Sequence, residues 1–202
     1  MESTTPKKTQ GFSLVELMIV VAVVLILTAV TVPRLLNTVS DISLRYAASD
    51  FSGLVQSARI QAVRKNTFYT ILQGTLPSGT PGYYLDLPKA GVYNNGDPVV
   101  PISSSVTFWP GIGSGAPNEG AFIASLNFTV NPGGSPLSFN ARGLPCVAVA
   151  NACPQTPGQG FVVFMSKPAV MGGVPWAAVV INPSGHIQQW TSDGNGNWIL
   201  RD

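Results

Sequence analysis

The sequence of 202 residues predicts an α+β protein, in which one long N-terminal helix packs on an antiparallel β-sheet domain. Three observations predict this fold. An apolar stretch near the N-terminus is long enough to cross a bilayer, and apolar residues at helical spacing follow it. The remainder consists of short β-branched and aromatic runs separated by glycine- and proline-rich turns. The 45% hydrophobic content is enough for the core of one domain plus an appendage.

The composition favours a β-rich domain outside the cytoplasm. Only 10% of residues are Asp, Glu, Lys or Arg, whereas an average soluble protein has about 25%. The 21 glycines and 17 prolines indicate many turns. The formal net charge of +2 is too small to indicate nucleic-acid binding by itself.

The first element is the apolar stretch, predicted as a membrane-spanning helix over residues 12–33. Between Phe12 and Val32 the only charged residue is Glu16, and a helix of that length is roughly 31 Å long, which matches the hydrocarbon core of a bilayer. Lys7 and Lys8 precede it, so the positive-inside tendency places the N-terminus in the cytoplasm and the domain outside.

Two ordinary explanations of this stretch leave residues unexplained. A cleaved secretory signal needs small residues just before the cut, and only Ala29 and Thr31 lie near suitable positions. A plain signal anchor gives no account of Glu16, since a carboxylate costs up to about 3 kcal/mol at the centre of a membrane helix. The cost is lower near the helix N-terminus, where the acid reaches the interface.

The stretch "KKTQGFSLVELMIV" resembles the cleavage and methylation motif of type IV prepilins and type II secretion pseudopilins. The resemblance implies a leader over residues 1–11, removed by a prepilin peptidase between Gly11 and Phe12, with methylation of the new N-terminus at Phe12. Glu16 then becomes the fifth residue of the mature chain, where this family has a glutamate. We expect it to act in assembly, because a carboxylate in apolar surroundings needs a cation, and a neighbouring subunit's amino terminus can supply one.

The same resemblance implies where the protein is located and what it contacts. It implies an inner-membrane protein with one membrane span and a periplasmic C-terminal domain, which then leaves the lipid for a pilus or pseudopilus. Its partners would be other pilin or pseudopilin subunits and the secretion or pilus assembly machinery. Pro33 falls where pilins commonly carry a helix-bending proline, and its missing N–H predicts a kink at the membrane exit.

The second half of the helix is predicted over residues 34–66. Polar residues separate apolar ones at steps of mostly three or four, and Arg64, Lys65 and Asn66 form a suitable helix C-terminus. Unbroken from Phe12 to Lys65, the helix would be about 80 Å long. The apolar positions are Leu35, Val39, Ile42, Tyr46, Ala47, Phe51, Leu54, Ala58 and Ala62.

The domain over residues 67–202 is predicted to hold eight or nine strands in one or two sheets, with the long helix on one face. Turn-forming clusters such as "NPGGSP", "NPSG" and "DGNGN" separate the runs, and residues 75–119 are expected to contain the longest loops. The nine runs are "TFYTIL", "GYYLDL", "SVTFWP", "SLNFTV", "PLSFN", "GFVVFMS", "WAAVVI", "HIQQW" and "NWIL".

A second resemblance is to the GspH/FimT group of minor pilins and pseudopilins. It rests on "AASDFSGLVQSARIQAVRKNTFYTIL", a helix followed at once by a strand, and on "FNARGLP" and "VVINPSGHIQQW" near the end. Gly143 and Gly185 in these two segments are interpreted as turn residues rather than binding residues.

Cys146 and Cys153 are predicted to form a local disulfide in an oxidising compartment. Their spacing is not C-x-x-C, and His186 is the only histidine, so there are too few ligands for a structural zinc site. Closure of so short a loop contributes on the order of 2 to 3 kcal/mol. Two reduced, buried thiols are the alternative.

The sequence predicts no enzyme, metal or cofactor. His186 has no accompanying catalytic motif, and neither G-x-S-x-G nor H-E-x-x-H occurs. "GIGSGA" from Gly111 fits a dinucleotide fingerprint only loosely, because Pro117 follows where a helix should begin. "DGNGNW" from Asp193 begins like a calcium loop but has Trp198 at the sixth position, so we interpret it as a β-turn.

Two alternatives from other functional classes remain open at this point. One is a DNA-binding minor pilin in DNA uptake, and the other is a simple membrane-anchored periplasmic binding domain. Removal of residues 1–11 would leave a net charge of only +1. Basic residues that could nevertheless gather on one face are Arg59, Arg64, Lys65, Arg142, Lys167 and Arg201.

Overall fold

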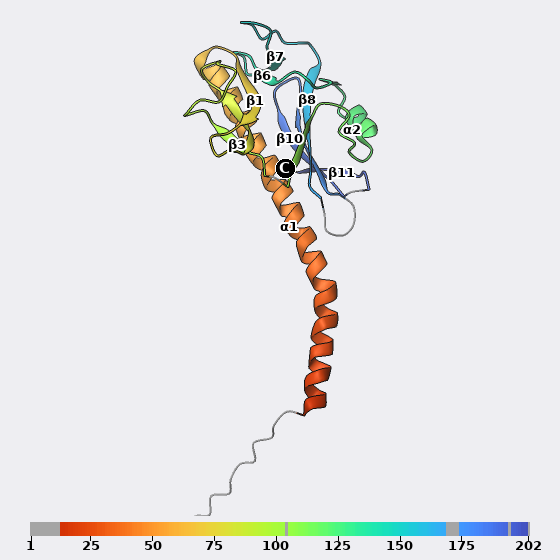
Figure 1. The fold of residues 1–202 in the computed structure, drawn as a ribbon. Coiled ribbons are helices and arrows are strands. Elements are labelled where there is room, and N and C mark those ends of the chain that lie inside the picture. Colours follow the sequence, from red (N-terminus) through yellow and green to blue (C-terminus); the bar gives the residue numbers. More distant parts are fainter. Residues whose placement is uncertain (1–12, 104, 169–173, 194, 202) are drawn as a thin grey trace, which may run out of the picture.

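The computed structural model describes residues 13–103, 105–168, 174–193 and 195–201, and the predicted leader and cleavage site lie outside them. Figure 1 shows a long helix that projects from a β-rich domain, so the α+β prediction is confirmed. The described elements are α1 (Leu14–Lys65), β1 (Tyr69–Thr75), β2 (Pro81–Asp86), β3 (Val99–Pro101), β4 (Thr107–Pro110), α2 (Glu119–Ser125), β5 (Thr129–Val130), β6 (Leu137–Phe139), β7 (Pro145–Val147), β8 (Gln159–Ser166), β9 (Trp176–Ile181), β10 (Ile187–Ser192) and β11 (Trp198–Arg201).

Helix α1 has 52 residues and ends where the sequence predicts. Asn66 caps it in the left-handed conformation at φ 52°, and its N–H donates to the carbonyls of Ala62 and Val63. Asparagine tolerates this conformation better than most residues, so the cap explains the sharp end. The helix is continuous through position 33, and the kink at Pro33 stays a prediction.

The strands form two main sheets. The first has the order β3-β2-β1-β6-β7, and the second has the order β11-β10-β9-β8-β4 with β5 added in parallel to β8. All nine predicted runs contain a strand. Sequence reasoning missed β3, β7 and α2, because segments of three to seven residues are too short to show a clear hydrophobic period.

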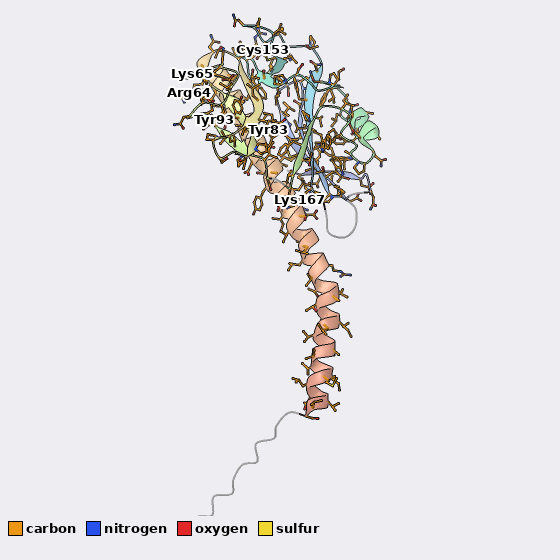
Figure 2. The ribbon with its side chains drawn as sticks, viewed as in Figure 1. Arg64, Lys65, Tyr83, Tyr93, Cys153 and Lys167 are labelled. Atoms are coloured by element: carbon orange, nitrogen blue, oxygen red, sulfur yellow. A yellow bond between two sulfur atoms is a disulfide. The ribbon has the colours of Figure 1, made fainter. Side chains whose placement is uncertain are left out.

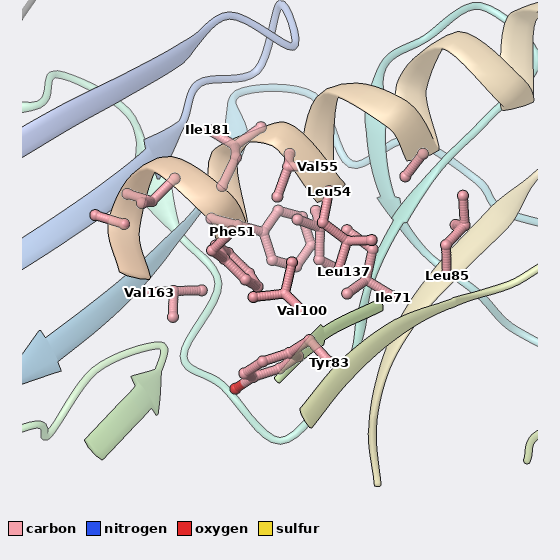
Figure 3. Close-up of a cluster of buried hydrophobic side chains, with 14 of the residues drawn as sticks. Phe51, Leu54, Val55, Ile71, Tyr83, Leu85, Val100, Leu137, Val163 and Ile181 are labelled. Carbon is pink, nitrogen blue, oxygen red and sulfur yellow. The ribbon is translucent and has the colours of Figure 1, made fainter. Parts of the chain in front are cut away.

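The second half of α1 packs against both sheets and forms the main core. Phe51, Val55 and Ala58 of α1 are buried there with Tyr83, Leu85 and other apolar side chains of the strands, as Figure 3 shows for ten labelled residues. Alanines at 48, 58 and 62 keep the buried face of the helix small, which allows a close approach to the sheets. Among the described residues this core begins at Leu44, so the domain does not depend on the first half of α1.

A second core covers the outer face of the six-stranded sheet. Phe122 of α2 stacks on Trp198 with ring centroids 4.4 Å apart, and Phe164 and Trp190 lie edge-on to Phe122. Strands β8 and β9 are therefore buried on both faces, which explains why they read as continuous rather than alternating apolar runs.

The domain does not cover the first apolar positions of the amphipathic pattern in α1. Leu35, Val39, Ile42 and Tyr46 are all exposed, and the buried stripe instead begins with Ser40 and Leu44. The domain contacts α1 only from about residue 40, so helical spacing alone could not tell which apolar side faces it. From Phe51 onward the predicted positions Leu54, Ala58 and Ala62 are buried.

Cys146 and Cys153 form a disulfide, with their Cα atoms 5.5 Å apart. The predicted pairing is confirmed, and the alternative of reduced thiols is wrong. The bond joins β7 to the loop that follows, where Val149 and Ala152 form an isolated β-bridge. The disulfide therefore closes a short hairpin at the edge of the five-stranded sheet.

Candidate functional site: the exposed half of helix α1 and its polar residues

The first half of α1 projects from the domain (Figure 1). Its apolar side chains are not covered by the rest of the described chain. Fourteen large apolar side chains between Leu14 and Val32 are each at least 49% exposed. Burial of one such side chain is worth about 1.5 to 3 kcal/mol, so leaving all of them in water would cost tens of kcal/mol. By length and composition this is the one helix among the described residues that could cross a membrane. The segment requires an apolar environment, either lipid or other helices.

Polar side chains in this half of α1 mostly form hydrogen bonds to the backbone of their own helix. The Thr28 hydroxyl donates to the Val24 carbonyl at 3.0 Å, and the Thr31 hydroxyl donates to the Leu27 carbonyl at 2.8 Å. Hydroxyls bonded back to their own helix impose little cost in an apolar environment. Glu16 is the exception.

Glu16 lies in the first turn of α1 and is exposed. It forms no ion pair with any residue in the part of the chain that the structure describes. The positive end of the helix macrodipole stabilises a carboxylate in the first turn by about 0.3 to 1 kcal/mol, which does not offset the cost of placing it in lipid. A cation from outside the described residues would remove this cost.

At the other end of α1, Arg59 joins the helix to both sheets. Its Nε donates to the Gly143 carbonyl at 3.1 Å. A Cβ atom on Gly185 would lie 2.6 Å from that same carbonyl oxygen and 3.3 Å from Arg59 Nε. The two glycines and the arginine therefore meet at one point.

The two glycines occupy equivalent turns. The Asn140 side-chain oxygen accepts from the N–H groups of Arg142 and Leu144, and the Asn182 side-chain oxygen accepts from those of Ser184 and His186. Gly143 and Gly185 have φ of 74° and 80°, so the prediction that they are turn residues is confirmed. One turn connects β6 to β7 and the other connects β9 to β10. Both turns have the sequence pattern Asn-x-x-Gly directly after a strand, and this pattern indicates that the two turns are alike.

The six basic residues predicted as a group fall into two groups. Arg59, Arg64, Lys65 and Arg142 lie at the end of α1 or on the turn that it contacts. Figure 2 shows Lys167 at the opposite end of the domain from Arg64 and Lys65, near the exposed half of α1. Arg201, whose Nε donates to the Thr191 hydroxyl, lines the same small pocket as Pro175, which accepts the Lys167 N–H. The structure does not place all six on one face.

The glycine-rich loop "GIGSGA" donates hydrogen bonds to the side chain of Glu119 in the same chain. The Glu119 carboxylate accepts from the N–H groups of Gly113 and Gly115 at 2.6 and 3.0 Å and from the Ser114 hydroxyl at 2.9 Å. Burial acts to raise the pKa of Glu119, but these hydrogen bonds outweigh it and the pKa is lowered. The segment is a loop, as the sequence predicts, and it already holds an anion.

Strands β10 and β11 pair antiparallel, and Asp193, Asn195 and Asn197 of the "DGNGNW" segment lie between them. The Asp193 carboxylate accepts from the Asn197 side chain at 2.8 Å and from the Asn195 and Asn197 N–H groups. The side-chain hydrogen bond from Asn197 and the backbone bonds lower the pKa of Asp193. The Asp193 carboxylate therefore accepts hydrogen bonds from within its own turn.

Residues 6–32 match the family described as the prokaryotic N-terminal methylation motif. The matched range covers the predicted cleavage site and nearly all of the exposed apolar helix. Comparison with curated proteins and with solved structures gives no match. The motif supports a type IV pilin-like protein, a class of structural subunits that are cut by a prepilin peptidase and assemble with other pilins.

Proposed function

We propose that this protein is a minor pilin or pseudopilin of the GspH/FimT type, assembled into a type IV pilus or into the pseudopilus of a type II secretion system. The observation that carries the proposal is the methylation motif on an apolar helix that the domain leaves uncovered. Such a helix must be surrounded by lipid before assembly and by other apolar helices after assembly.

In this proposal the chain has four parts with separate tasks. Residues 1–11 are a leader, residues 12–33 anchor the protein in the inner membrane, residues 34–66 join anchor to domain, and residues 67–202 form the periplasmic domain. Prepilin peptidase cuts between Gly11 and Phe12 and methylates Phe12. The cut creates a cationic amine four residues before Glu16.

Glu16 then guides assembly through its charge. A carboxylate and an amine 4 Å apart attract each other by about 4 kcal/mol at an effective dielectric constant of 20. A helix that moves from lipid into a bundle of helices exchanges contacts with acyl chains for contacts with apolar side chains, with little net gain in free energy. The ion pair therefore favours the bundle over lipid and fixes the axial position of each helix against its neighbour. The domain remains at the outside of the filament, where it contacts neighbours or cargo.

The test is a comparison of Glu16→Gln with Asp41→Asn in the native host. Both variants remove one exposed acid from α1 without changing its size, but only Glu16 lies in the apolar segment. We expect Glu16→Gln to insert and fold normally while its amount in sheared filaments falls at least about tenfold, which corresponds to about a third of the 4 kcal/mol above. Asp41→Asn should assemble like the wild type. Normal incorporation of Glu16→Gln at native expression would contradict the proposal.

A further inference from the structure

We propose that Asn127 is a modification site, at which a glycan is attached to the side-chain nitrogen after export of the domain. The segment "NFT", residues 127–129, is the single place in the sequence where Ser or Thr follows an asparagine two positions later without an intervening proline. This pattern is the acceptor for N-linked glycans in exported proteins. The inference rests on the proposed function, because it requires the domain to lie outside the cytoplasm.

The structure presents this segment at the surface. Asn127 lies on the connection between α2 and β5, and the side chains of Asn127 and Thr129 are both exposed. Phe128 between them is half-buried and packs against the second core. A Cβ atom on Gly160 would collide with the Phe128 ring, so the ring lies directly against backbone. The ring therefore anchors the segment, while the two residues that define the acceptor remain accessible to a transferase.

The Asn127 side chain is also free to react. Asn118 and Asn127 are both exposed and both have a left-handed backbone, with φ of 51° and 57°. The Asn118 side-chain nitrogen donates to the Gly196 carbonyl at 3.4 Å. Within the part of the chain that the structure describes, the Asn127 side chain forms no hydrogen bond. Asn118 therefore serves as an internal control that has the same conformation but lacks the acceptor pattern.

The position of Asn127 is compatible with assembly. Helix α2 and its connection to β5 lie on the face of the six-stranded sheet opposite to α1 (Figure 1). A filament whose core consists of α1 helices leaves this face on the outside. A glycan at Asn127 would therefore not block the packing of α1 against neighbouring helices.

An open groove beside Asn127 suits the first sugar of such a glycan. Its volume is about 820 Å³, within the range of about 300 to 1,000 Å³ that is usual for ligand sites. Ser184 on the β9–β10 turn and Gln188 on β10 line the other side, and no residue that lines the groove is charged. Amides and hydroxyls can both donate to and accept from sugar hydroxyls, and the Phe128 ring offers an apolar surface to the C–H face of a sugar.

Gln188 is the residue that we expect to contact this sugar. Its side-chain amide has no hydrogen-bond partner among the described residues. It points to the same face of the sheet as Trp190, because side chains alternate along β10 and Ile187 packs on the opposite core. A sugar on Asn127 would reach this amide across the groove that both residues line.

The attachment is a group transfer from a lipid-linked sugar donor, an oligosaccharide on a polyprenyl diphosphate. A bond forms between C1 of the first sugar and the Asn127 side-chain nitrogen, and the bond between C1 and the phosphate oxygen breaks. The lipid diphosphate leaves with the electron pair of that bond. The nitrogen loses one of its two protons to a base of the transferase, so no oxidant or reductant is required.

The test is mass spectrometry of the full chain purified from its native host, with Thr129→Ser and Thr129→Val beside the wild type. Valine has the shape of threonine without its hydroxyl, and no described hydrogen bond uses that hydroxyl, so both variants should fold. We expect the wild type and Thr129→Ser to carry the same glycan mass on Asn127. Thr129→Val should carry none, and Asn118 should be unmodified in all three proteins.

An unmodified Asn127 in the wild type would overturn the proposal, as would equal modification of Thr129→Val. The N-terminal peptide of the same digest separates this result from the proposed function. A chain that begins at methylated Phe12 with an unmodified Asn127 refutes the glycan alone. A chain that retains Lys7 and Lys8 refutes the processing on which the proposed function depends.

A second measurement tests the place of the sugar in the groove. Gln188→Ala is compared in the wild-type background and in the Thr129→Val background, as full chains in detergent micelles. Loss of one net hydrogen bond should lower the unfolding temperature by about 2 to 4 °C in the glycosylated background only. Equal shifts in the two backgrounds would show that Gln188 does not contact the sugar.

Discussion

The contact between Arg59 and the two Asn-x-x-Gly turns predicts a large difference between two glycine substitutions. Gly185→Ala and Gly79→Ala both place a Cβ atom on a residue in the left-handed region, with φ of 80° and 77°. At Gly79 the new atom meets nothing within 4 Å. At Gly185 it would lie 2.6 Å from the Gly143 carbonyl oxygen, which Arg59 holds in place. The pair therefore separates backbone strain from the contact itself.

The expected magnitudes follow from these distances. The left-handed conformation costs an alanine about 1 to 2 kcal/mol, and this is the whole expected loss of unfolding free energy for Gly79→Ala. Gly185→Ala adds the cost of displacing packed backbone, about 1 to 3 kcal/mol, for a total of about 2 to 5 kcal/mol. In a fragment of this size each kcal/mol lowers the unfolding temperature by about 2 to 4 °C.

Thermal and urea unfolding of a fragment that begins at residue 34 would measure both losses, since every residue of the described core lies within it. Gly185→Ala should unfold at least about 2 °C below Gly79→Ala. Equal losses in the two variants would show that the turns around Arg59 yield without cost, and would refute the role given to this contact.

Further predictions concern the disulfide and the Glu119 loop. Replacement of Cys146 and Cys153 by serine should lower the unfolding free energy by about 2 to 3 kcal/mol in urea titrations, because it releases a short loop in the unfolded chain only; an unchanged midpoint would contradict this. The pKa of Glu119 is lowered in the folded state, so its contribution to stability is complete above its unfolded pKa and is lost as the pH falls through the folded value. The stability difference between wild type and Glu119→Gln should thus be constant above about pH 5 and shrink in more acidic solution; a difference that grows on acidification would refute the assignment.

Local sequence signals predicted much of the fold. The C-terminus of α1 was predictable because Arg64, Lys65 and Asn66 combine a favourable charge with a residue that tolerates positive φ. The long strands β8 and β9 were predictable because β-branched and aromatic residues fill them between turn signals. The disulfide followed from two cysteines in one short loop with too few other metal ligands.

Features that depend on distant contacts were not predictable. Arg59 and Gly143 are 84 positions apart, and nothing local to either indicates that they meet. The exposure of Leu35 and Val39 depends on where the domain begins to cover α1, which helical spacing does not encode. The close approach of Gly111 to the backbone of Gly133 joins two separate loops. These features depend on how distant segments pack together, which local sequence patterns do not indicate.

The central claim is that processing at Gly11 turns a membrane anchor into an assembly helix. Mass spectrometry of the N-terminal peptide of protein purified from its native host tests this most directly. The account predicts a chain that begins at Phe12 with one added methyl group on its amine. A chain that retains Lys7 and Lys8, or that begins without methylation at another residue, would contradict it.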